Sequence, residues 1–464
     1  MRYVSEAEFW NWRLVTLILS VVIMPLWIGR AIASGSYLFI LLFLFSCLVL
    51  FFYLKLFELF IMMTFIINHN VFYLLPLEPM GKYSYESLLL VVLFITIVVV
   101  LLIKLQKKDV FHTQFGILMI CFLIMSILGA FNSSYLGQPL MLGLKKAIFV
   151  FSPIIFYFIF QSKKIDDQRL FNLIVVIGVC LALLNNIQYL FYGKLNLFQH
   201  TSEFVRLARA GHLRYLVGGF FTIFSPIVAL SQYLTMGRKR FLLAFIYMAG
   251  TVVLQSQTRA VIWGFLVTGF FMFSIAKKIQ LKKILFIGVP IGVFLIWFLP
   301  FIQSGRWGEF YQLTKSEITN REGNWGVRLD AYDFYFAETI KSPLIGRGIW
   351  NETFDVYLGD NQEDRGPGGT GLVDIGIMML LFRFGLIGAL WLVLLLSKVY
   401  RTMFLRFGEL KKNVQYFVAG YFVFGLATIL TIDCFTQQGV IIYLALNLAL
   451  LSQVNGSAQT EDTL

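Results

Sequence analysis

The chain has 464 residues, of which 59% are hydrophobic and only 14% are charged. A soluble core does not need that much apolar surface, so the composition excludes an ordinary globular protein and indicates a polytopic membrane protein. The formal net charge of +13 would suggest nucleic acid as the partner of a soluble protein. Here it agrees with the excess of basic residues on the cytoplasmic side of membrane proteins. We therefore expect membrane lipid around this chain and no nucleic acid.

The N-terminal segment 1–13 is charged and aromatic, and the apolar run after it has no small-residue cleavage site. We therefore expect a retained first helix and not a removed signal peptide. The four cysteines fall in or at the ends of apolar runs, without the spacing of a disulfide framework or a metal site. Clustered metal ligands and nucleotide-binding glycine motifs are also missing from the sequence, so we expect neither a metal nor a cofactor.

Apolar runs of roughly 20 residues, the length that crosses the hydrocarbon of a bilayer, follow one another along the chain. They predict an all-α polytopic fold with about fourteen transmembrane helices. The predicted spans are 14–29, 36–54, 57–75, 86–103, 114–130, 144–161, 170–192, 215–236, 241–257, 260–276, 284–302, 374–397, 414–432 and 439–453. Only Gln257–Arg259 separates 241–257 from 260–276, so this pair is interpreted as a tight hairpin.

The spans divide the chain into four parts. Residues 1–302 contain the N-terminal helices, 303–373 form one large polar loop, 374–453 contain the C-terminal helices, and 454–464 form a disordered tail. If the N-terminus is cytoplasmic, the clusters of lysine and arginine in the short connections all face the cytoplasm. Both termini are then cytoplasmic and the large loop is extracytoplasmic.

The outer face of this predicted topology is rich in arginine. The guanidinium group is a planar fork of donors suited to phosphate oxygens. A charge held near hydrocarbon needs a partner, and the pyrophosphate of a lipid-linked substrate would supply one. The candidate ligands are Arg206, Arg214, Arg259, Arg328 and Arg347. The alternative, equally open for any single arginine, is pairing with the acidic residues of the 303–373 loop, which outnumber its basic ones.

Arg259 is the strongest of these candidates. It lies at the tip of the short hairpin, which cannot carry its side chain far from the membrane boundary. Arg383 differs from it, because it lies well inside the predicted span 374–397. There we expect a structural role, either by snorkelling to the interface or by pairing with a polar side chain.

Two aspartates stand at the outer ends of predicted spans. Asp374 opens the span 374–397, where a carboxylate beside cationic groups can act as a general base for a sugar hydroxyl. Helix capping explains Asp374 equally well, and for Asp433 we favour capping. His200 and His212 also face outward in this topology, but isolated histidines are weak signals.

Within the large loop, the pattern predicts a helix from a cap at Asn324 to Ile340, with Pro343 stopping it. We expect this helix to lie on the membrane surface, because apolar side chains recur at helical spacing. They are Leu329, Tyr332, Phe336 and Ile340. Beyond the helix, two glycines bracket Arg347.

Four segments resemble the O-antigen ligase and polymerase superfamily of membrane glycosyltransferases. Arg214, followed by a glycine and a proline, is similar to the segment that opens one span of the family. Ser256-Gln-Thr-Arg259 resembles the family's hairpin tip. Arg328, followed by the Pro-Leu-Ile-Gly-Arg-Gly segment 343–348, resembles the family's arginine helix and its closing turn.

The fourth segment departs from a ligase. Asp374 stands eleven residues before Gly385-Leu-Ile-Gly388, where a ligase would show His-Asn. Ligases of the superfamily are thought to use that histidine on the acceptor sugar, so the aspartate favours a Wzy-type polymerase of O-antigen, capsule or exopolysaccharide. The resemblance covers about 206–388.

The resemblance implies a GT-C-like, metal-independent enzyme in the bacterial inner membrane, with undecaprenyl-pyrophosphate-linked glycans as donor and acceptor. A chain-length-regulating copolymerase is a further candidate partner. With the outer arginines and Asp374 taken together, we expect catalysis from Asp374, Arg259 and Arg328 and pyrophosphate binding by Arg206, Arg214, Arg259, Arg328 and Arg347. A ligase that moves the glycan to lipid A-core is the alternative. A flippase or transporter is a second one, but it should carry charges along several spans, whereas Arg383 is the only basic residue well inside one.

Overall fold

The structure is a computed structural model. It describes Leu48, 56–69, 113–161, 163–192, 194, 197–198, 206–207, 213–214, 218–256, 258–276, 323–350, 375–405, 410–437 and 439–453. The predicted spans 14–29, 86–103 and 284–302, and nearly all of 36–54, lie outside the described residues. So do Asp374, His200 and His212.

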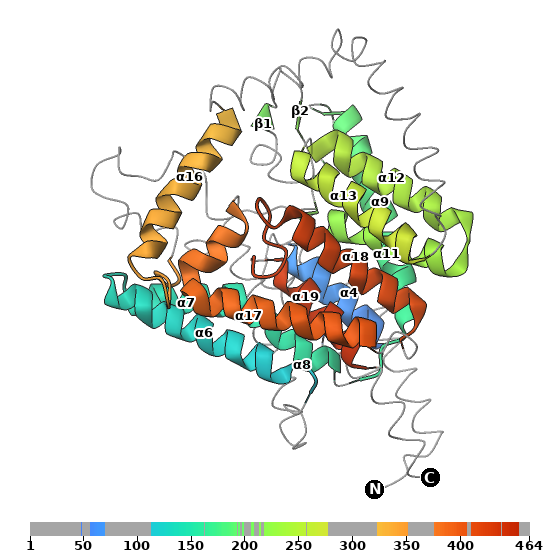
Figure 1. Cartoon of the computed structure of the whole chain (residues 1–464). Coiled ribbons are helices and arrows are strands. Elements are labelled where there is room, and N and C mark those ends of the chain that lie inside the picture. The colour runs from blue at the N-terminus through green and yellow to red at the C-terminus, as the bar shows by residue number, and fades with distance from the viewer. Residues whose placement is uncertain are drawn as a thin grey trace, which may run out of the picture.

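The regular structure in the described residues is helical except for two strands of two residues each. The elements are α4 (Phe57–Asn68), α6 (Gly116–Tyr135), α7 (Leu140–Phe151), η3 (Ser152–Ile155), α8 (Phe156–Gln161), α9 (Asp167–Leu190), β1 (Arg206–Leu207), β2 (Leu213–Arg214), α11 (Phe221–Met236), α12 (Lys239–Ser256), α13 (Arg259–Ile275), α16 (Gly323–Ile340), α17 (Ile377–Leu405), α18 (Lys412–Thr428) and α19 (Ile441–Ser452). The predicted all-α class is confirmed for this part of the chain (Figure 1).

Three of the described helices are long and apolar enough to cross a membrane, namely α6, α9 and α17 over Ile377–Phe404. The apolar helices α4, α11, α13 and α19 are shorter. The count of about fourteen spans stays a prediction. The tight hairpin is present as α12 and α13, which are separated by two residues.

Three expected boundaries were wrong. The segment 144–161 is not one helix, because η3 separates α7 from α8; Pro153 lies in η3, and proline cannot donate a helical hydrogen bond. The span predicted at 374–397 extends to Leu405 and is broken at Gly385. The helix expected to start from a cap at Asn324 begins at Gly323, although it ends at Ile340 as predicted.

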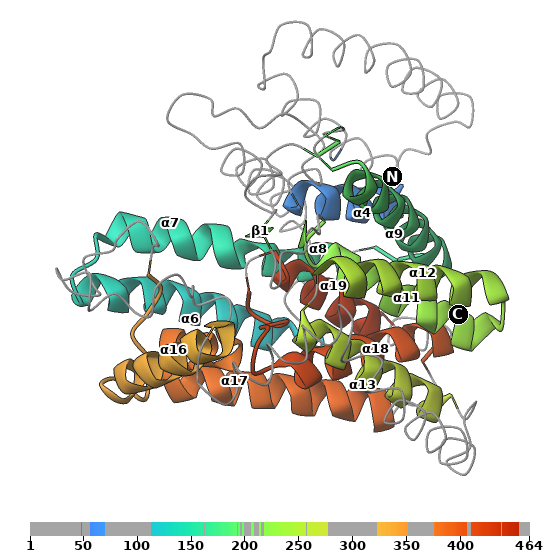
Figure 2. The same cartoon turned by 90° about the horizontal axis from the view of Figure 1, so that it is seen from above.

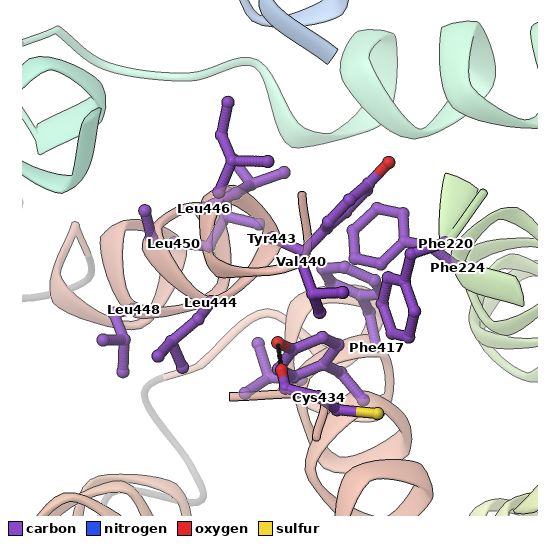
Figure 3. Packing of buried hydrophobic residues seen from close by; sticks show 14 of the residues in the cluster. Phe220, Phe224, Phe417, Cys434, Val440, Tyr443, Leu444, Leu446, Leu448 and Leu450 are labelled. Carbon is purple, nitrogen blue, oxygen red and sulfur yellow. Dashed lines mark hydrogen bonds between the residues drawn. The ribbon is translucent and has the colours of Figure 1, made fainter. Parts of the chain in front are cut away.

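The centre of the bundle is α19, in which every residue is buried. A helix that is apolar on all sides can be enclosed in this way by its neighbours. Aromatic rings surround its first turn: the centroid of the Tyr443 ring lies 4.4 Å from that of Phe224 and 4.6 Å from that of Phe65. Phe224 also packs at 5.0 Å against Phe417 (Figure 3). These rings join α4, α11 and α18 to α19.

Polar side chains tie the helices together at one end of the bundle. Asp167, at the start of α9, accepts hydrogen bonds from Lys411 and Asn413 at the start of α18. Glu58, at the start of α4, accepts from the backbone N–H of Asp166 at 3.0 Å. Three helices therefore begin together at this end, which we call the Asp167 end.

A second set of contacts joins the C-terminal end of α4 to neighbouring helices. The ring of His69 shares a buried hydrogen bond with the Tyr443 hydroxyl at the start of α19. Asn68 donates to the carbonyl of Gly439 at 2.8 Å. Gly219, just before α11, lies so close that a Cβ there would be 2.8 Å from His69 Nδ1. Helices α11 and α19 therefore begin where α4 ends, at what we call the His69 end, and run opposite to α4.

The break in α17 is repaired by another segment of the chain. Gly385 has φ 59° and ψ −149°, so the helical bonds from residues 386 and 387 to 382 and 383 are lost. The turn Pro343–Gly348, which follows α16, supplies substitutes. Leu386 and Ile387 donate to the carbonyls of residues 343 and 344, at 2.8 and 3.2 Å, and the amides of residues 347 and 348 donate to those of 382 and 383, at 2.6 and 3.2 Å.

Glycine is required where these segments meet. A Cβ on Gly385 would lie 2.5 Å from the Pro343 carbonyl oxygen, and one on Gly348 would lie 2.3 Å from that of Gly129 in α6. Both residues have positive φ, which side chains disfavour. The turn is therefore wedged between α17 and α6, and this contact fixes the C-terminal end of α16.

We predict that Gly385→Ala destabilises the protein, because positive φ costs about 1–3 kcal/mol for a residue with a side chain and the added Cβ meets backbone. Thermal unfolding of the protein in detergent measures the effect. Gly250→Ala is the matched control, since Gly250 lies inside α12 with open space around it, and alanine there should be neutral or stabilising. Equal melting temperatures for the two variants would contradict the packing described.

Candidate functional site

The positions of two candidate arginines pair in the backbone of a short hairpin. β1 and β2 pair antiparallel, with Arg206 opposite Arg214. The fold therefore brings these two positions, which are eight residues apart in the sequence, next to each other.

The hairpin lies against the helix that leads to Arg259. β2 contacts α12, and Arg259 is the first residue of α13, directly after the tip. Figure 1 shows β1 and β2 above the ends of these helices. The structure thus brings the Arg214 and Arg259 segments, which the sequence separates by 45 positions, to the same part of the bundle.

The tip of the α12–α13 hairpin is held by its own polar groups. The Ser256 hydroxyl accepts from the backbone N–H of Thr258 at 3.3 Å, and the Thr258 hydroxyl donates to the Ser256 carbonyl at 3.2 Å. Ser256 itself is buried. The serine and threonine of the tip therefore fix the backbone from which Arg259 starts.

Below the tip lies a polar network that the sequence interpretation missed. Gln255, which is buried, donates to Asn186 of α9 at 2.8 Å. Asn186 in turn donates to the hydroxyls of Tyr247 and Thr251, both at 2.9 Å. These bonds attach α12 to α9 one turn below Arg259. The spacing of Gln255 from the tip was a usable signal, but its partner on α9 was not visible in the sequence.

Helix α16 carries Arg328 and is anchored at two places. The Tyr332 hydroxyl donates to the carbonyl of Leu430, just beyond α18, and the ring of Tyr335 packs 5.0 Å from that of Phe382 in α17. Burial raises the pKa of Tyr332, while the positive charge of Arg328 acts to lower it. Arg328 is thus close enough to influence Tyr332 and lies on the partly buried side of α16.

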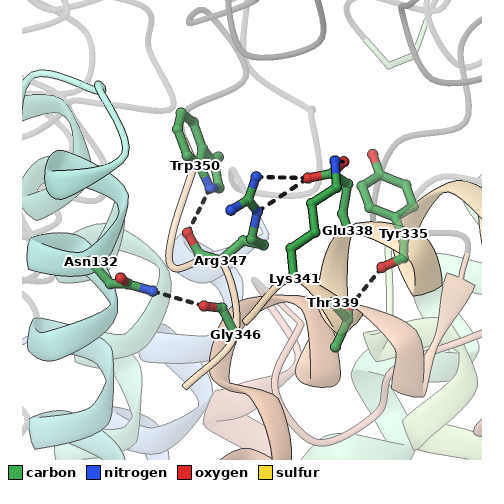
Figure 4. Close-up of polar contacts among 8 residues, drawn as sticks. All are labelled: Asn132, Tyr335, Glu338, Thr339, Lys341, Gly346, Arg347 and Trp350. Atoms are coloured by element: carbon green, nitrogen blue, oxygen red, sulfur yellow. Dashed lines mark hydrogen bonds and ion pairs between the residues drawn. The ribbon is translucent and has the colours of Figure 1, made fainter. Parts of the chain in front are cut away.

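Arg347 is engaged by a carboxylate. Its Nη2 and Nε lie 2.8 and 3.1 Å from Oε2 of Glu338, and the other oxygen of Glu338 accepts from Lys341. The Arg347 and Glu338 side chains are only 14% and 12% exposed, whereas Lys341 is 60% exposed (Figure 4). For Arg347 the alternative interpretation, pairing with an acid of the loop, holds in this structure; its binding to pyrophosphate stays a prediction.

The chain next to Asp374 is fixed although Asp374 itself is outside the described residues. The amide of Ile377 donates to the Ile429 carbonyl at 2.7 Å, and a Cβ on Gly376 would lie 2.1 Å from the same oxygen. Tyr332 binds the next residue, Leu430. The Arg328 helix and the segment that follows Asp374 therefore converge on residues 429–430.

Asp433 and Arg383 are both buried inside the protein. Asp433 is buried and accepts from the amides of Phe435 and Thr436, both at 2.8 Å, and from the Thr436 hydroxyl. These bonds belong to a tight turn and not to a helix N-terminus, so the capping role favoured for Asp433 was wrong, because α18 ends at Thr428 and α19 begins only at Ile441. Burial raises the pKa of Asp433, and these hydrogen bonds and the charge of Arg383 oppose the rise. Arg383 is 5% exposed, so it does not snorkel to water in this structure.

The candidate residues thus form two groups. Arg206, Arg214 and Arg259 belong to the hairpin and the α12–α13 tip, while Arg328 and the segment after Asp374 meet at the end of α18. Among the described residues, no group of three or more His, Cys, Asp or Glu side chains could hold a metal ion. Glu338 and His69 are further residues that sequence reasoning missed, since neither stands in a motif.

One part of the chain is similar to a known protein family. Residues 243–393 match the O-antigen ligase family. The matched region runs from α12 to the middle of α17 and therefore includes Arg259, Arg328, Arg347, Asp374 and the broken helix. A comparison with curated proteins found no match. The family and the apolar helices identify an integral membrane protein and indicate an enzyme of O-antigen or related polysaccharide processing.

We predict that Arg347→Met and Glu338→Gln each destabilise the protein by about 1–3 kcal/mol, the usual effect of breaking a partly buried charged hydrogen bond. In the double variant the two losses should not add. Lys341→Met should cost less than about 1 kcal/mol, because its ion pair is exposed. Thermal unfolding of the four variants gives the coupling, and full additivity would contradict the pair.

Proposed function

We propose that this protein polymerises undecaprenyl-pyrophosphate-linked oligosaccharide repeat units on the outer face of the inner membrane, with both termini in the cytoplasm. The observation that carries the proposal is the O-antigen ligase match over 243–393. It covers Arg259, Arg328 and Asp374, and the contact between β2 and α12 adds the segment of Arg214 to them. No nucleotide sugar is needed, because the glycosyl-pyrophosphate bond already stores the energy of transfer.

In the proposed reaction a hydroxyl of the acceptor repeat unit attacks the anomeric carbon of the donor glycan. The bond from that carbon to the pyrophosphate oxygen breaks, and undecaprenyl pyrophosphate leaves with the electron pair. Asp374 orients the acceptor and takes the hydroxyl proton. The protein's main contribution is then to align the two lipid-linked substrates.

The arginines stabilise the charge that develops on the leaving group. Arg214, Arg259 and Arg328 donate to the pyrophosphate oxygens, and Arg206, opposite Arg214 in the hairpin, adds a further positive charge. Such fixed donors stabilise a transition state most when they are already held in place. The hydrogen bonds of Ser256 and Gln255 around the tip give the backbone at Arg259 this rigidity.

A ligase remains the second candidate, because the matched family is described by that activity. Asp374 is the residue that favours the polymerase, since a ligase resembling this chain would carry histidine there. Both enzymes require the pyrophosphate site and the same donor. They differ only in the acceptor, which is another repeat unit for a polymerase and lipid A-core or another surface acceptor for a ligase.

We predict that Arg259→Ala lowers the rate of polymerisation by about 10²- to 10³-fold, the usual effect of removing one fixed charge stabiliser. The measurement is the chain-length distribution formed from lipid-linked repeats by protein in liposomes. Arg238→Ala is the matched control, because Arg238 is exposed at the opposite end of the same helical hairpin and should leave the rate unchanged. Normal polymer from the Arg259 variant at normal membrane levels would refute the assignment.

The second prediction separates the two enzymes. Cells that lack a polymerase should carry single repeat units on the surface acceptor, because ligation still proceeds. Cells that lack a ligase should instead accumulate long polymer on undecaprenyl pyrophosphate. Gel analysis of surface and lipid-linked glycans from a deletion strain distinguishes these results, and we expect the first. The second result would assign the ligase activity.

A further inference from the structure

The exposed surface of α16 changes character along its length. In the middle of the helix, Asp330 and Asp333 are exposed. Near its C-terminal end the large exposed hydrophobic side chains are Phe336 and Ile340, which are 57% and 59% exposed. The opposite side of the helix is covered by α17, because Ala331, Tyr335 and Thr339 are buried. The middle of α16 thus presents charge to its surroundings, and its C-terminal end presents large apolar side chains.

The apolar end continues into the turn that follows α16. Leu344 and Ile345 are 64% and 51% exposed. The carbonyl of Leu344 accepts from the amide of Ile387, so the turn lies alongside the start of the second half of α17. There Leu386 and Leu390 are also exposed, by 56% and 58%. The exposed apolar side of a candidate membrane span is therefore continuous with the exposed apolar end of α16.

The position of this turn across a bilayer follows from α17. Lys398 lies 5.7 Å over the ring of Phe115, just before α6, and Arg401, one turn further on, is exposed. Basic residues of this kind mark a membrane boundary. From Leu386 to Arg401 the helix rises about 22 Å at 1.5 Å per residue. The hydrocarbon is about 30 Å thick, so Leu386 and the turn beside it fall inside it, and any tilt places them deeper.

A bare turn could not remain in hydrocarbon, because unpaired peptide groups are costly there. In this structure the amides of residues 346, 347 and 348 and the carbonyls of 343 and 344 are all hydrogen bonded within the chain. Asn132 of α6 also donates to the carbonyl of Gly346 at 2.8 Å. Six backbone groups of the turn are therefore satisfied from inside the protein. Its exposed side chains, Pro343, Leu344 and Ile345, are apolar.

We propose that the last turn of α16 and the segment Pro343–Ile345 are inserted into the bilayer, with the acyl chains of membrane lipid as their partner. The middle of the helix, with Asp330 and Asp333, stays in water. Helix α16 therefore enters the membrane obliquely by its C-terminal end and does not lie flat on the surface as the sequence suggested. Lys341 lies between the two inserted segments, where its charge is paired with Glu338 and its long side chain can reach toward the membrane surface.

Spin-label accessibility tests the proposal in the full-length protein. Single cysteines replace Asp330, Asp333, Ile340 and Leu344 in a background without the four native cysteines, and each variant is labelled and reconstituted into phospholipid liposomes. We expect oxygen to collide more often than a water-soluble nickel chelate with labels at Ile340 and Leu344. The matched labels at Asp330 and Asp333, on the same helix, should show the reverse. These positions are exposed, so the labels should not disturb folding.

Two results would overturn the proposal. If the nickel chelate reaches all four labels equally, the end of α16 lies in water. If neither reagent reaches Ile340 and Leu344, a protein surface, such as a second copy of the chain, covers them instead of lipid. The measurement needs no substrate, so its outcome is independent of whether the protein polymerises glycans.

Discussion

The exchange of backbone hydrogen bonds between the turn Pro343–Gly348 and the broken helix α17 is the contact on which the rest of the arrangement depends. It replaces two lost helical bonds with four bonds to the turn. Because the turn ends α16, this contact also sets the position of Arg328 relative to the bundle. It explains why the glycine-containing segments 343–348 and 382–388 occur together although they are distant in the sequence. Each supplies hydrogen-bond partners for the backbone of the other.

The polar contacts at the two ends of the bundle agree with the predicted alternation of helix direction. The starts of α4, α9 and α18 meet at the Asp167 end, while those of α11 and α19 meet at the His69 end (Figure 2 shows the bundle from above). The Arg214 hairpin precedes α11 and contacts α12. The candidate site therefore lies on the loops at the end of the bundle opposite Asp167. Polar contacts at both ends of the bundle hold the helices that carry these loops.

Hydropathy was sufficient to predict the helical class, the α12–α13 hairpin and the end of α16 at Ile340, because each follows from local apolar content, spacing or a stopping proline. It could not predict the break at Gly385, since α17 is continuously apolar and its replacement partners come from residues about 40 positions earlier. Likewise, arginine-rich loops indicated an anion site, but only the fold showed that Glu338 holds Arg347. Long-range pairing of this kind leaves no periodic pattern in the sequence.

The central claim is that guanidinium groups at the outer boundary bind the diphosphate of a lipid-linked glycan. The most direct measurement is an electron cryo-microscopy map of the protein in lipid nanodiscs with undecaprenyl pyrophosphate. The account predicts diphosphate density within hydrogen-bonding distance of Arg259 and Arg214, at the end of the bundle opposite Asp167. Guanidinium groups that face lipid or are fully engaged by carboxylates, with the diphosphate bound elsewhere, would contradict it.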